Sequence, residues 1–186
     1  MKIVLASQSP RRKELLGRLV SEFAIQPAAI DETPIKGEDP VTYVQRMAYE
    51  KAQAVVEQQT EQTLVIASDT TVVHQQQILG KPVDLADAKA TLQSLSGETH
   101  QVYTAVVLKS KEREEKILAQ AEVTFYPLTE QEIDTYLATG DYQDKAGSYG
   151  IQSFAGAFVK EIRGDYYSIV GFPIGAVNQS LKKFVF

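Results

Sequence analysis

Three consecutive cations, Arg11-Arg12-Lys13, follow Ser9-Pro10 close to the start of the sequence. Serine is a favourable N-cap and proline suits the first helical position, so this stretch predicts the first turn of a helix. A helix N-terminus already carries partial positive charge and unpaired N–H groups, and three more cations raise its energy unless an anion joins them. The pattern therefore indicates an anion site, with phosphate as the expected anion. The alternative, solvated basic residues in an ordinary first turn, fits this stretch equally well.

One aspartate stands inside a strand pattern that is otherwise almost wholly apolar. Residues 63–74 predict a central buried strand, and Asp69 interrupts its run of apolar side chains. An ionised carboxylate in such a place is costly unless it is paired, hydrogen-bonded or bound to a metal. The apolar run resumes at Val72 without turn residues between, which favours a functional carboxylate over one that merely caps a turn.

Two lysines and a pair of carboxylates are further candidates, each with two interpretations. Lys51 falls on the apolar face of a helix expected over about residues 40–58, where it either extends to solvent or reaches a buried anion. Lys81, between a glycine and a proline, is either held over a cleft or exposed on a turn. Asp31-Glu32 lies in a polar, turn-rich loop and is either a solvated turn or a metal contact.

Several cations and one protected acid suit a polyphosphate substrate with a divalent metal. The cations neutralise phosphate oxygens, and the acid activates water or holds the metal. A covalent nucleophile is not expected, because the sequence has no cysteine, no Gly-x-Ser-x-Gly and no evident Ser/His pairing. A Gly-x-x-x-x-Gly-Lys-[Ser/Thr] loop is also absent from the sequence, which excludes a P-loop NTPase.

Length and composition are those of an ordinary globular protein. The 186 residues, 44% hydrophobic and 23% charged, are enough for one large domain or two small lobes. The net charge of −5 argues against a general nucleic-acid or membrane-surface binder. No apolar run is long enough to span a bilayer.

The elements that must position these residues alternate between strand–helix pairs and hairpins. Strands are expected over about 1–6, 22–27, 63–74, 75–79, 100–108, 117–127, 157–162 and 166–170, and helices after Ser9, Asp39, Asp84, Thr129 and Pro173. In the third of these helices, Leu85 is expected to face inward. This order predicts an α/β fold with a mixed sheet and helices on both sides, or two lobes around a cleft.

The sequence closely resembles the Maf family of nucleoside triphosphate pyrophosphatases. The matching segments occur in family order over nearly the whole chain: Leu5-Ala6-Ser7, Ser9-Pro10-Arg11-Arg12, Asp31-Glu32, Tyr43-Val44 with Arg46, Glu50-Lys51-Ala52, Ser68-Asp69-Thr70, Leu79-Gly80-Lys81-Pro82, Leu95-Ser96-Gly97 with His100, residues 144–152, and Val170-Gly171-Phe172-Pro173-Ile174. Each segment alone is weak evidence, and together they are very specific.

The resemblance implies a fold of the inosine-triphosphate-pyrophosphatase type, a mixed sheet with flanking helices and two lobes around a cleft. It implies a single domain over residues 1–186, with a smaller lobe over roughly 98–140. It further implies a cytoplasmic homodimer that hydrolyses nucleoside triphosphates between the α and β phosphates with a divalent metal, Mg²⁺ or Mn²⁺. Neither a membrane nor a stable nucleic-acid partner is expected.

The resemblance also assigns roles to individual positions. Asp69 matches the family's proton acceptor, and Glu32, in a cleft motif, is expected to hold the metal together with Asp69. The expected substrate-binding positions are the phosphate-contacting cations Arg11, Lys51 and Lys81, the specificity positions Arg12, Thr70 and Gln152, and Ser7 in a cleft motif.

The loop that ends in Tyr149-Gly150-Ile151-Gln152 resembles the branch acting on dTTP and UTP. Gln152 presents both a donor and an acceptor, as the imide edge of thymine or uracil requires. Ser153, Ser168 and Phe172 depart from the family pattern, in which glycine, asparagine and leucine are more typical. Two alternatives stay open, the branch acting on 7-methyl-GTP and a non-catalytic nucleotide-binding regulator of cell division.

Overall fold

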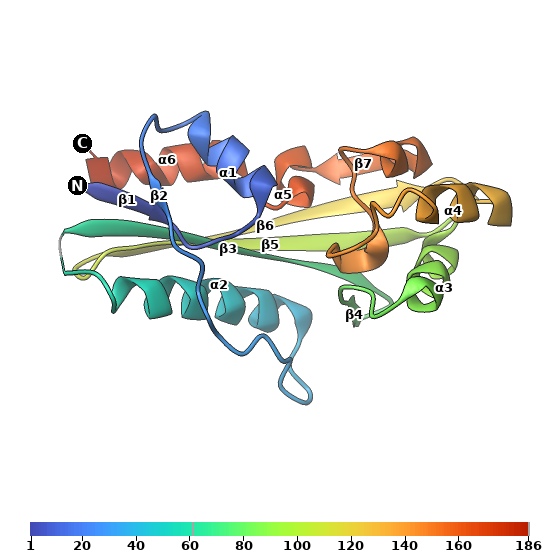
Figure 1. Cartoon of the computed structure of the whole chain (residues 1–186), viewed down its shortest axis with the longest axis horizontal. Helices are drawn as coiled ribbons and strands as arrows, with labels where there is room; N and C mark the ends of the chain where they lie inside the picture. Colours follow the sequence, from blue (N-terminus) through green and yellow to red (C-terminus); the bar gives the residue numbers. More distant parts are fainter. Residues whose placement is uncertain (61, 186) are drawn as a thin grey trace. The chain divides into compact units, whose positions relative to one another are not determined.

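A computed structural model describes residues 1–60 and 62–185 of the chain. Within these residues the strands form a seven-stranded mixed sheet in the order β2-β1-β3-β5-β6-β7, with β4 paired to β3 (Figure 1). The strands are β1 Lys2–Leu5, β2 Ala24–Ile25, β3 Thr63–His74, β4 Gln77–Leu79, β5 Thr99–Lys109, β6 Glu114–Phe125 and β7 Val159–Gly164. The sheet is mixed because β1 is parallel to β2 and β3, whereas β4 and β7 are antiparallel to their neighbours. The expected α/β fold with a mixed sheet and flanking helices is confirmed.

The described helices are α1 Pro10–Gly17, α2 Pro40–Val56, α3 Leu85–Leu95, α4 Glu130–Leu137, α5 Tyr166–Val170 and α6 Ile174–Val185, with short 3-10 turns at Ala146–Ser148 and Phe154–Phe158. The first four begin directly after the N-caps that the sequence predicts, Ser9, Asp39, Asp84 and Thr129. The Ser9 side chain accepts from the Arg12 N–H, and Thr129 and Glu132 form a capping box. Among the described helices, none combines the length and apolar character that a membrane crossing needs.

The chain divides into two compact units, and each is described by itself. The first contains residues 1–69, 104–119 and 171–186, and the second contains residues 70–103 and 120–170. The strands β3, β5 and β6 each contribute residues to both units. The second unit therefore shares residues 98–103 and 120–140 with the lobe expected from the sequence and also contains 70–97 and 141–170. A single domain over the whole chain stays a prediction.

In the first unit, the parallel register of β1 and β3 sets up one edge of the sheet. Leu5 pairs with Ile66, and the Ala6 N–H donates to the Ile66 carbonyl at 2.8 Å. Continuing that register by two residues places Ser7 beside Ser68. Within this unit, α2 lies on one side of β1 and α1 and α6 lie on the other (Figure 1). The carboxyl end of β1 thus leads directly into the cation-rich start of α1.

The core of the second unit is rich in aromatic rings. Phe125 contacts the rings of His100, Tyr149 and Phe158 edge-on, with centroids 4.9–6.0 Å apart. These rings pack with apolar residues of α3 and α4, including the fully buried Leu92. Large, mutually perpendicular rings leave little freedom for the backbone segments that carry them.

Two expectations for the second unit are wrong. Residues 166–170 form α5 rather than a strand, because Asp165 caps them: its carboxylate accepts from the Tyr167 N–H at 2.9 Å, and its carbonyl accepts from the Ser168 hydroxyl at 2.7 Å. These local bonds override the strand propensity of Tyr-Tyr-Ser-Ile-Val. Leu85, expected to face inward, is 54% exposed at the start of α3.

Candidate functional site

The centre of the site in the first unit is a buried ion pair between α2 and β3. Lys51 Nζ donates to Asp69 Oδ1 at 2.7 Å, and both side chains are about nine-tenths buried. Lys51 therefore reaches a buried anion rather than solvent, and Asp69 lies inside β3, where the sequence places it. Removing one partner of such a pair leaves the other charge buried and unpaired, at a cost of about 3–5 kcal/mol.

A second carboxylate approaches the same ammonium group from the loop before α2. Glu32 Oε2 lies 3.1 Å from Lys51 Nζ, and half of the Glu32 side chain is exposed. The Tyr43 hydroxyl donates to the Glu32 carbonyl at 3.0 Å. Burial, together with the negative charges of Asp69 and Glu32, raises the pKa of Tyr43 to about 12, so the phenol stays a neutral donor.

Arg12 connects the start of α1 to the segment before α6. Arg12 Nε donates to the Gly171 carbonyl at 3.0 Å, which also accepts from the Ser68 hydroxyl at 2.9 Å. Arg12 Nη1 lies 3.5 Å from Ser7 Oγ, which also accepts from the Ser9 N–H at 3.2 Å. Ser7 and Arg12 therefore meet just beyond the carboxyl end of β1.

Burial and neighbouring charges shift the pKa of Arg12 in opposite directions. Desolvation lowers the pKa of Arg12, Asp69 raises it, and repulsion from Arg11 lowers it further. Arg11 is half-buried and makes no hydrogen bond or ion pair with other described residues. The three cations Arg11, Arg12 and Lys51 outnumber the two carboxylates Glu32 and Asp69, which leaves a net charge of +1 beside the N-terminus of α1. This excess favours an anionic ligand.

The remaining predicted positions, Thr70, Lys81 and Gln152, belong to the second unit. Thr70 is half-buried in β3, and Lys81 and Gln152 are both exposed. The Gly147 N–H donates to the Gly80 carbonyl at 3.1 Å, which joins the turn of Lys81 to the loop that ends at Gln152. A shared binding surface between these residues and those of the first unit stays a prediction.

The loop of residues 141–153 has a closely defined backbone. Gly147 has φ +69°, and a Cβ there would lie 3.0 Å from the Val72 side chain. Asp141 accepts from the Ser153 hydroxyl, from Lys145 Nζ at 3.1 Å and from the Tyr136 hydroxyl at 3.2 Å. This network, centred on Asp141, joins the two ends of the loop that presents Gln152.

Sequence reasoning missed several residues that hold the site together. Arg46 lies in a segment that matches the family, but the sequence predicts no role for it, and it predicts none for Asp141. Ser153 was noted as a departure from a usual glycine, yet its hydroxyl binds Asp141. One feature of the sequence points to Arg46: it lies five residues before Lys51, on the same predicted helix.

The two carboxylates of the first unit, Glu32 and Asp69, would supply two of the oxygen ligands of a divalent cation. Because 2.7 Å and 3.1 Å contacts reach the same Lys51 nitrogen, the oxygens of Asp69 and Glu32 are no more than 5.8 Å apart. In residues 1–60 and 62–185, no group of three or more His, Cys, Asp and Glu side chains could hold a metal. Mg²⁺ commonly takes one or two carboxylates and completes its octahedron with water and substrate phosphates, so this pair fits that mode.

The family model and the relatives found by sequence indicate one family, and a solved structure shows the same fold. The family model described as Maf-like protein matches residues 2–184. The chain is 49% identical to a protein named dTTP/UTP pyrophosphatase from Bacillus cytotoxicus, over 98% of this chain and 95% of that protein. A protein of the same name from Pseudoalteromonas atlantica is 47% identical, over 97% and 96% of the two chains. The solved structure of a HAM1 protein from Coxiella burnetii, at 15% identity and a TM-score of 0.50 over 98% and 99% of the chains, shares the fold alone.

Proposed function

Because the chain belongs to the Maf-like protein family, we propose that it hydrolyses dTTP and UTP to the nucleoside monophosphate and pyrophosphate, the activity by which its relatives are named. The chain is then a hydrolase that acts on the bond between the α and β phosphates. The single observation that carries the proposal is the buried Asp69 carboxylate, paired with Lys51 inside a site of net positive charge. A protein that only binds anions has no reason to bury a carboxylate beside its cations.

In the proposed reaction, water attacks phosphorus and the α–β phosphoanhydride bond breaks. Asp69 accepts the proton of the attacking water, and pyrophosphate leaves with the electron pair of the broken bond. Lys51 orients the Asp69 carboxylate through its 2.7 Å contact, and Arg11 and Arg12 stabilise the charge that develops on the phosphate oxygens. In the second unit, Lys81 is proposed to contact phosphate, and Ser7 lines the site in the first.

A divalent cation, Mg²⁺ or Mn²⁺, is part of the proposal. Glu32 and Asp69 would hold it, since both carboxylates already approach one positive charge. When bound, the cation supplies charge neutralisation and Lewis acidity toward the phosphate oxygens. Glu32, half exposed, is free to take a ligand on its open side.

Base selection is assigned to two residues of the second unit, Gln152 and Thr70, and to Arg12 of the first unit. Gln152 presents a donor and an acceptor to the imide edge of thymine or uracil, and Thr70 and Arg12 are the other proposed specificity positions. The Asp141 network supports this assignment because it restricts the loop that carries Gln152. We further propose that the enzyme works as a cytoplasmic homodimer without a membrane or stable nucleic-acid partner.

The decisive experiment compares pyrophosphate release from dTTP, UTP, CTP and 7-methyl-GTP, with Mg²⁺ and with Mn²⁺. The wild-type protein should turn over dTTP and UTP, and Asp69→Asn should lower kcat by about a thousandfold or more while nucleotide binding persists. The control is Asp134→Asn, which removes an exposed carboxylate paired with Lys89 and should leave kcat unchanged. Near-normal rates in Asp69→Asn would refute the role of Asp69.

The same panel separates the alternatives. Steady release from 7-methyl-GTP but not from dTTP or UTP would assign the chain to the other branch of the family. Binding of dTTP without turnover, with either metal, would favour a nucleotide-binding regulator over an enzyme.

A further inference from the structure

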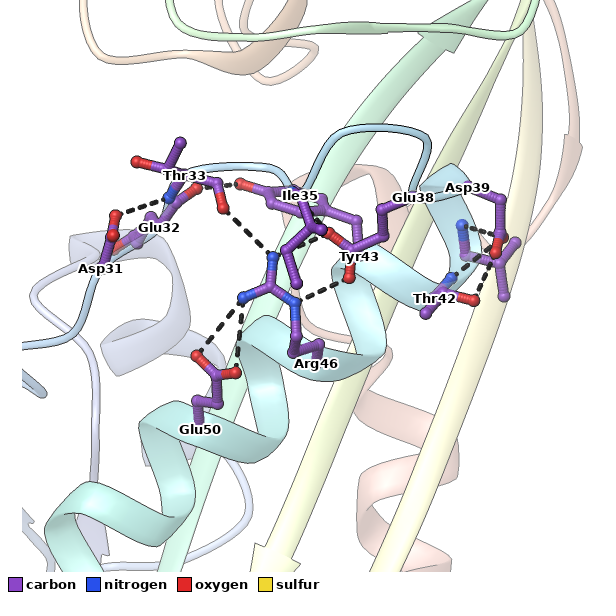
Figure 2. Close-up of polar contacts among 11 residues, drawn as sticks. Asp31, Glu32, Thr33, Ile35, Glu38, Asp39, Thr42, Tyr43, Arg46 and Glu50 are labelled. Carbon is purple, nitrogen blue, oxygen red and sulfur yellow. Dashed lines mark hydrogen bonds and ion pairs between the residues drawn. The ribbon is translucent and has the colours of Figure 1, made fainter.

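A second charged cluster lies one helical turn from the site, where the loop before α2 folds back on that helix (Figure 2). Arg46 of α2 binds Glu38 through two parallel contacts: Nε to Oε1 and Nη2 to Oε2, both at 2.7 Å. Such a bidentate pair fixes orientation as well as distance, because the guanidinium and the carboxylate are both planar. Only 20% of the Arg46 side chain and 5% of the Glu38 side chain are exposed.

The same arginine also holds the backbone beside Glu32. Arg46 Nη2 donates to the Thr33 carbonyl at 3.2 Å, while the Tyr43 hydroxyl donates to the Glu32 carbonyl at 3.0 Å. The guanidinium lies 5.7 Å from the centre of the Tyr43 ring, within the range of a cation–π contact. Two consecutive carbonyls of the loop are therefore bound by residues one turn apart on α2, as the dashed contacts in Figure 2 show.

The donors of Arg46 are already used within the protein. Nε and Nη2 serve Glu38 and Thr33, and Nη1 faces Glu50 at 3.4 Å and 3.5 Å. The hydrogen bonds that Arg46 donates to Glu38 raise the pKa of Arg46 and lower the pKa of Glu38. Arg46 differs in this respect from Arg11, which has no such partner among the described residues and is available to a ligand. Arg46 thus acts through the loop rather than on the substrate.

We propose that Arg46 is a positioning residue: its bridge to Glu38 closes residues 33–38 onto α2 and so fixes Glu32 against Lys51 and Asp69. The identity of the reaction that Glu32 serves rests on the proposed function. The closure of the loop onto α2 does not depend on the proposed function. Helix α2 then holds Glu32 in three ways: Tyr43 binds its carbonyl, Arg46 binds the carbonyl of the next residue, Thr33, and Lys51 binds its carboxylate. Without the bridge, an exposed loop without regular secondary structure must be ordered each time a ligand engages Glu32.

The first test measures closure of the loop independently of any activity. Lys36 is exposed within the closed segment and is followed by Gly37, so trypsin can report opening there. In Arg46→Gln, cleavage after Lys36, followed by mass spectrometry, should become about tenfold faster than in the wild type. The control is Arg18→Gln, which removes an exposed arginine paired with Glu14 four residues away and should not change that rate. An unchanged rate in Arg46→Gln overturns the closure.

The second test asks whether the closure reaches Glu32. Arg46→Gln should weaken Mn²⁺ binding, measured by titration calorimetry with a non-hydrolysable α,β-methylene analogue of dTTP, by about tenfold or more. Arg46→Lys keeps the charge but not the bidentate geometry, so it should show most of this loss, and it replaces Arg46→Gln if that variant does not fold. In a Glu32→Gln background, Arg46→Gln should cause no further loss.

Each outcome decides a different claim. An equal loss from Arg46→Gln in the wild-type and Glu32→Gln backgrounds overturns the inference, because Arg46 would then act on something other than Glu32. Full Mn²⁺ affinity in both Arg46 variants overturns it as well. Absence of pyrophosphate release from the wild type would sink the proposed function alone, since the proteolysis and Mn²⁺ measurements would still decide the role of Arg46.

Discussion

Each unit of the protein buries a polar pair in its interior, and the two pairs are built in opposite ways. In the first unit, Lys51 and Asp69 are both charged, and Glu32 adds a second carboxylate that is half exposed. In the second unit, His100 Nε2 and the Tyr149 hydroxyl share a hydrogen bond of 2.8 Å between two groups that carry no charge at neutral pH. The charged pair is reached by a carboxylate that is half exposed to solvent, whereas His100 and Tyr149 are both buried.

The surroundings of His100 explain its neutral state. The rings of Phe125 and Tyr149 stand edge-on to it, with centroids at 5.0 Å and 5.5 Å, and the side chain is fully buried. Burial, with a smaller contribution from repulsion by His74, lowers the pKa of His100 to about 4. Burial likewise raises the pKa of Tyr149. The pair is therefore locked as two neutral dipoles and has no charge to offer a substrate.

Burial of a polar side chain thus does not by itself mark a reactive site. What distinguishes the Lys51 centre is unbalanced charge: three cations face two carboxylates, and one carboxylate has access to solvent. The His100 centre pairs one ring nitrogen with the Tyr149 hydroxyl inside an aromatic core and leaves the buried Nδ1 without a hydrogen bond among the described residues, and it exposes no charge. The following predictions test whether the first centre serves turnover and the second serves stability.

Among the variants that test this contrast, the largest effect is expected from Lys51→Met, which keeps the length and apolar stem of the side chain but removes its charge. Asp69 and Glu32 lose their shared partner, and the net charge of the site falls from +1 to zero. We expect kcat for dTTP to fall by about a thousandfold, measured as steady-state pyrophosphate release. If Lys51→Met keeps more than about a tenth of the wild-type rate, the contrast between the two centres fails.

A second prediction concerns the pH dependence of stability that arises from His100. His100 binds its proton at a lower pH in the folded protein than in the unfolded chain, whose value is near 6.5. Between these values the unfolded state holds more protons, so stability contributed by neutral His100 is full above about pH 6.5 and is lost as pH falls toward about 4. The loss should amount to about 2–3 kcal/mol of unfolding free energy.

Urea unfolding of the wild type and of His100→Phe at pH 7.5, 6, 5 and 4 measures this loss. His100→Phe removes the titrating group and keeps an aromatic ring in the core, so its stability should decline less steeply over the same range. Carboxylates titrate in both proteins, and the difference between the two curves isolates His100. Parallel curves would contradict the prediction, and a large fall in kcat for His100→Phe at pH 7.5 would break the division of roles.

How much of this could be foreseen from the sequence depends on the range of the interaction involved. Strand β3 and the caps at Ser9, Asp39 and Thr129 were predicted because they depend on neighbours within a few residues. Helix α5 also depends on local contacts, but the sequence analysis predicts a strand there. The cap that Asp165 supplies outweighs the strand propensity of these five residues.

Contacts between distant segments required the structure. The sequence left two interpretations for Lys51, and the choice depended on Asp69, 18 residues away on another element. Arg46 could not be assigned because its partner Glu38 lies in a loop with no periodic pattern to fix its direction. The resemblance to a family indicated which residues gather, but not that Lys51 bridges two carboxylates.

The smallest effect is expected at Ser153 in the second unit, whose hydroxyl helps to order the loop that carries Gln152. Its hydroxyl binds the Asp141 carboxylate and donates to the Gly150 carbonyl at 2.9 Å, although the residue itself is exposed. Ser153→Gly should therefore lower the ratio of kcat/KM for dTTP over CTP by only about threefold, because Lys145 and Tyr136 still hold Asp141 beside the loop of Gln152. Asp141→Asn, which weakens all three contacts at once, should lower that ratio further. If the ratio responds equally to both substitutions, the Ser153 hydroxyl alone orders the loop. If it responds to neither, base selection does not depend on this loop.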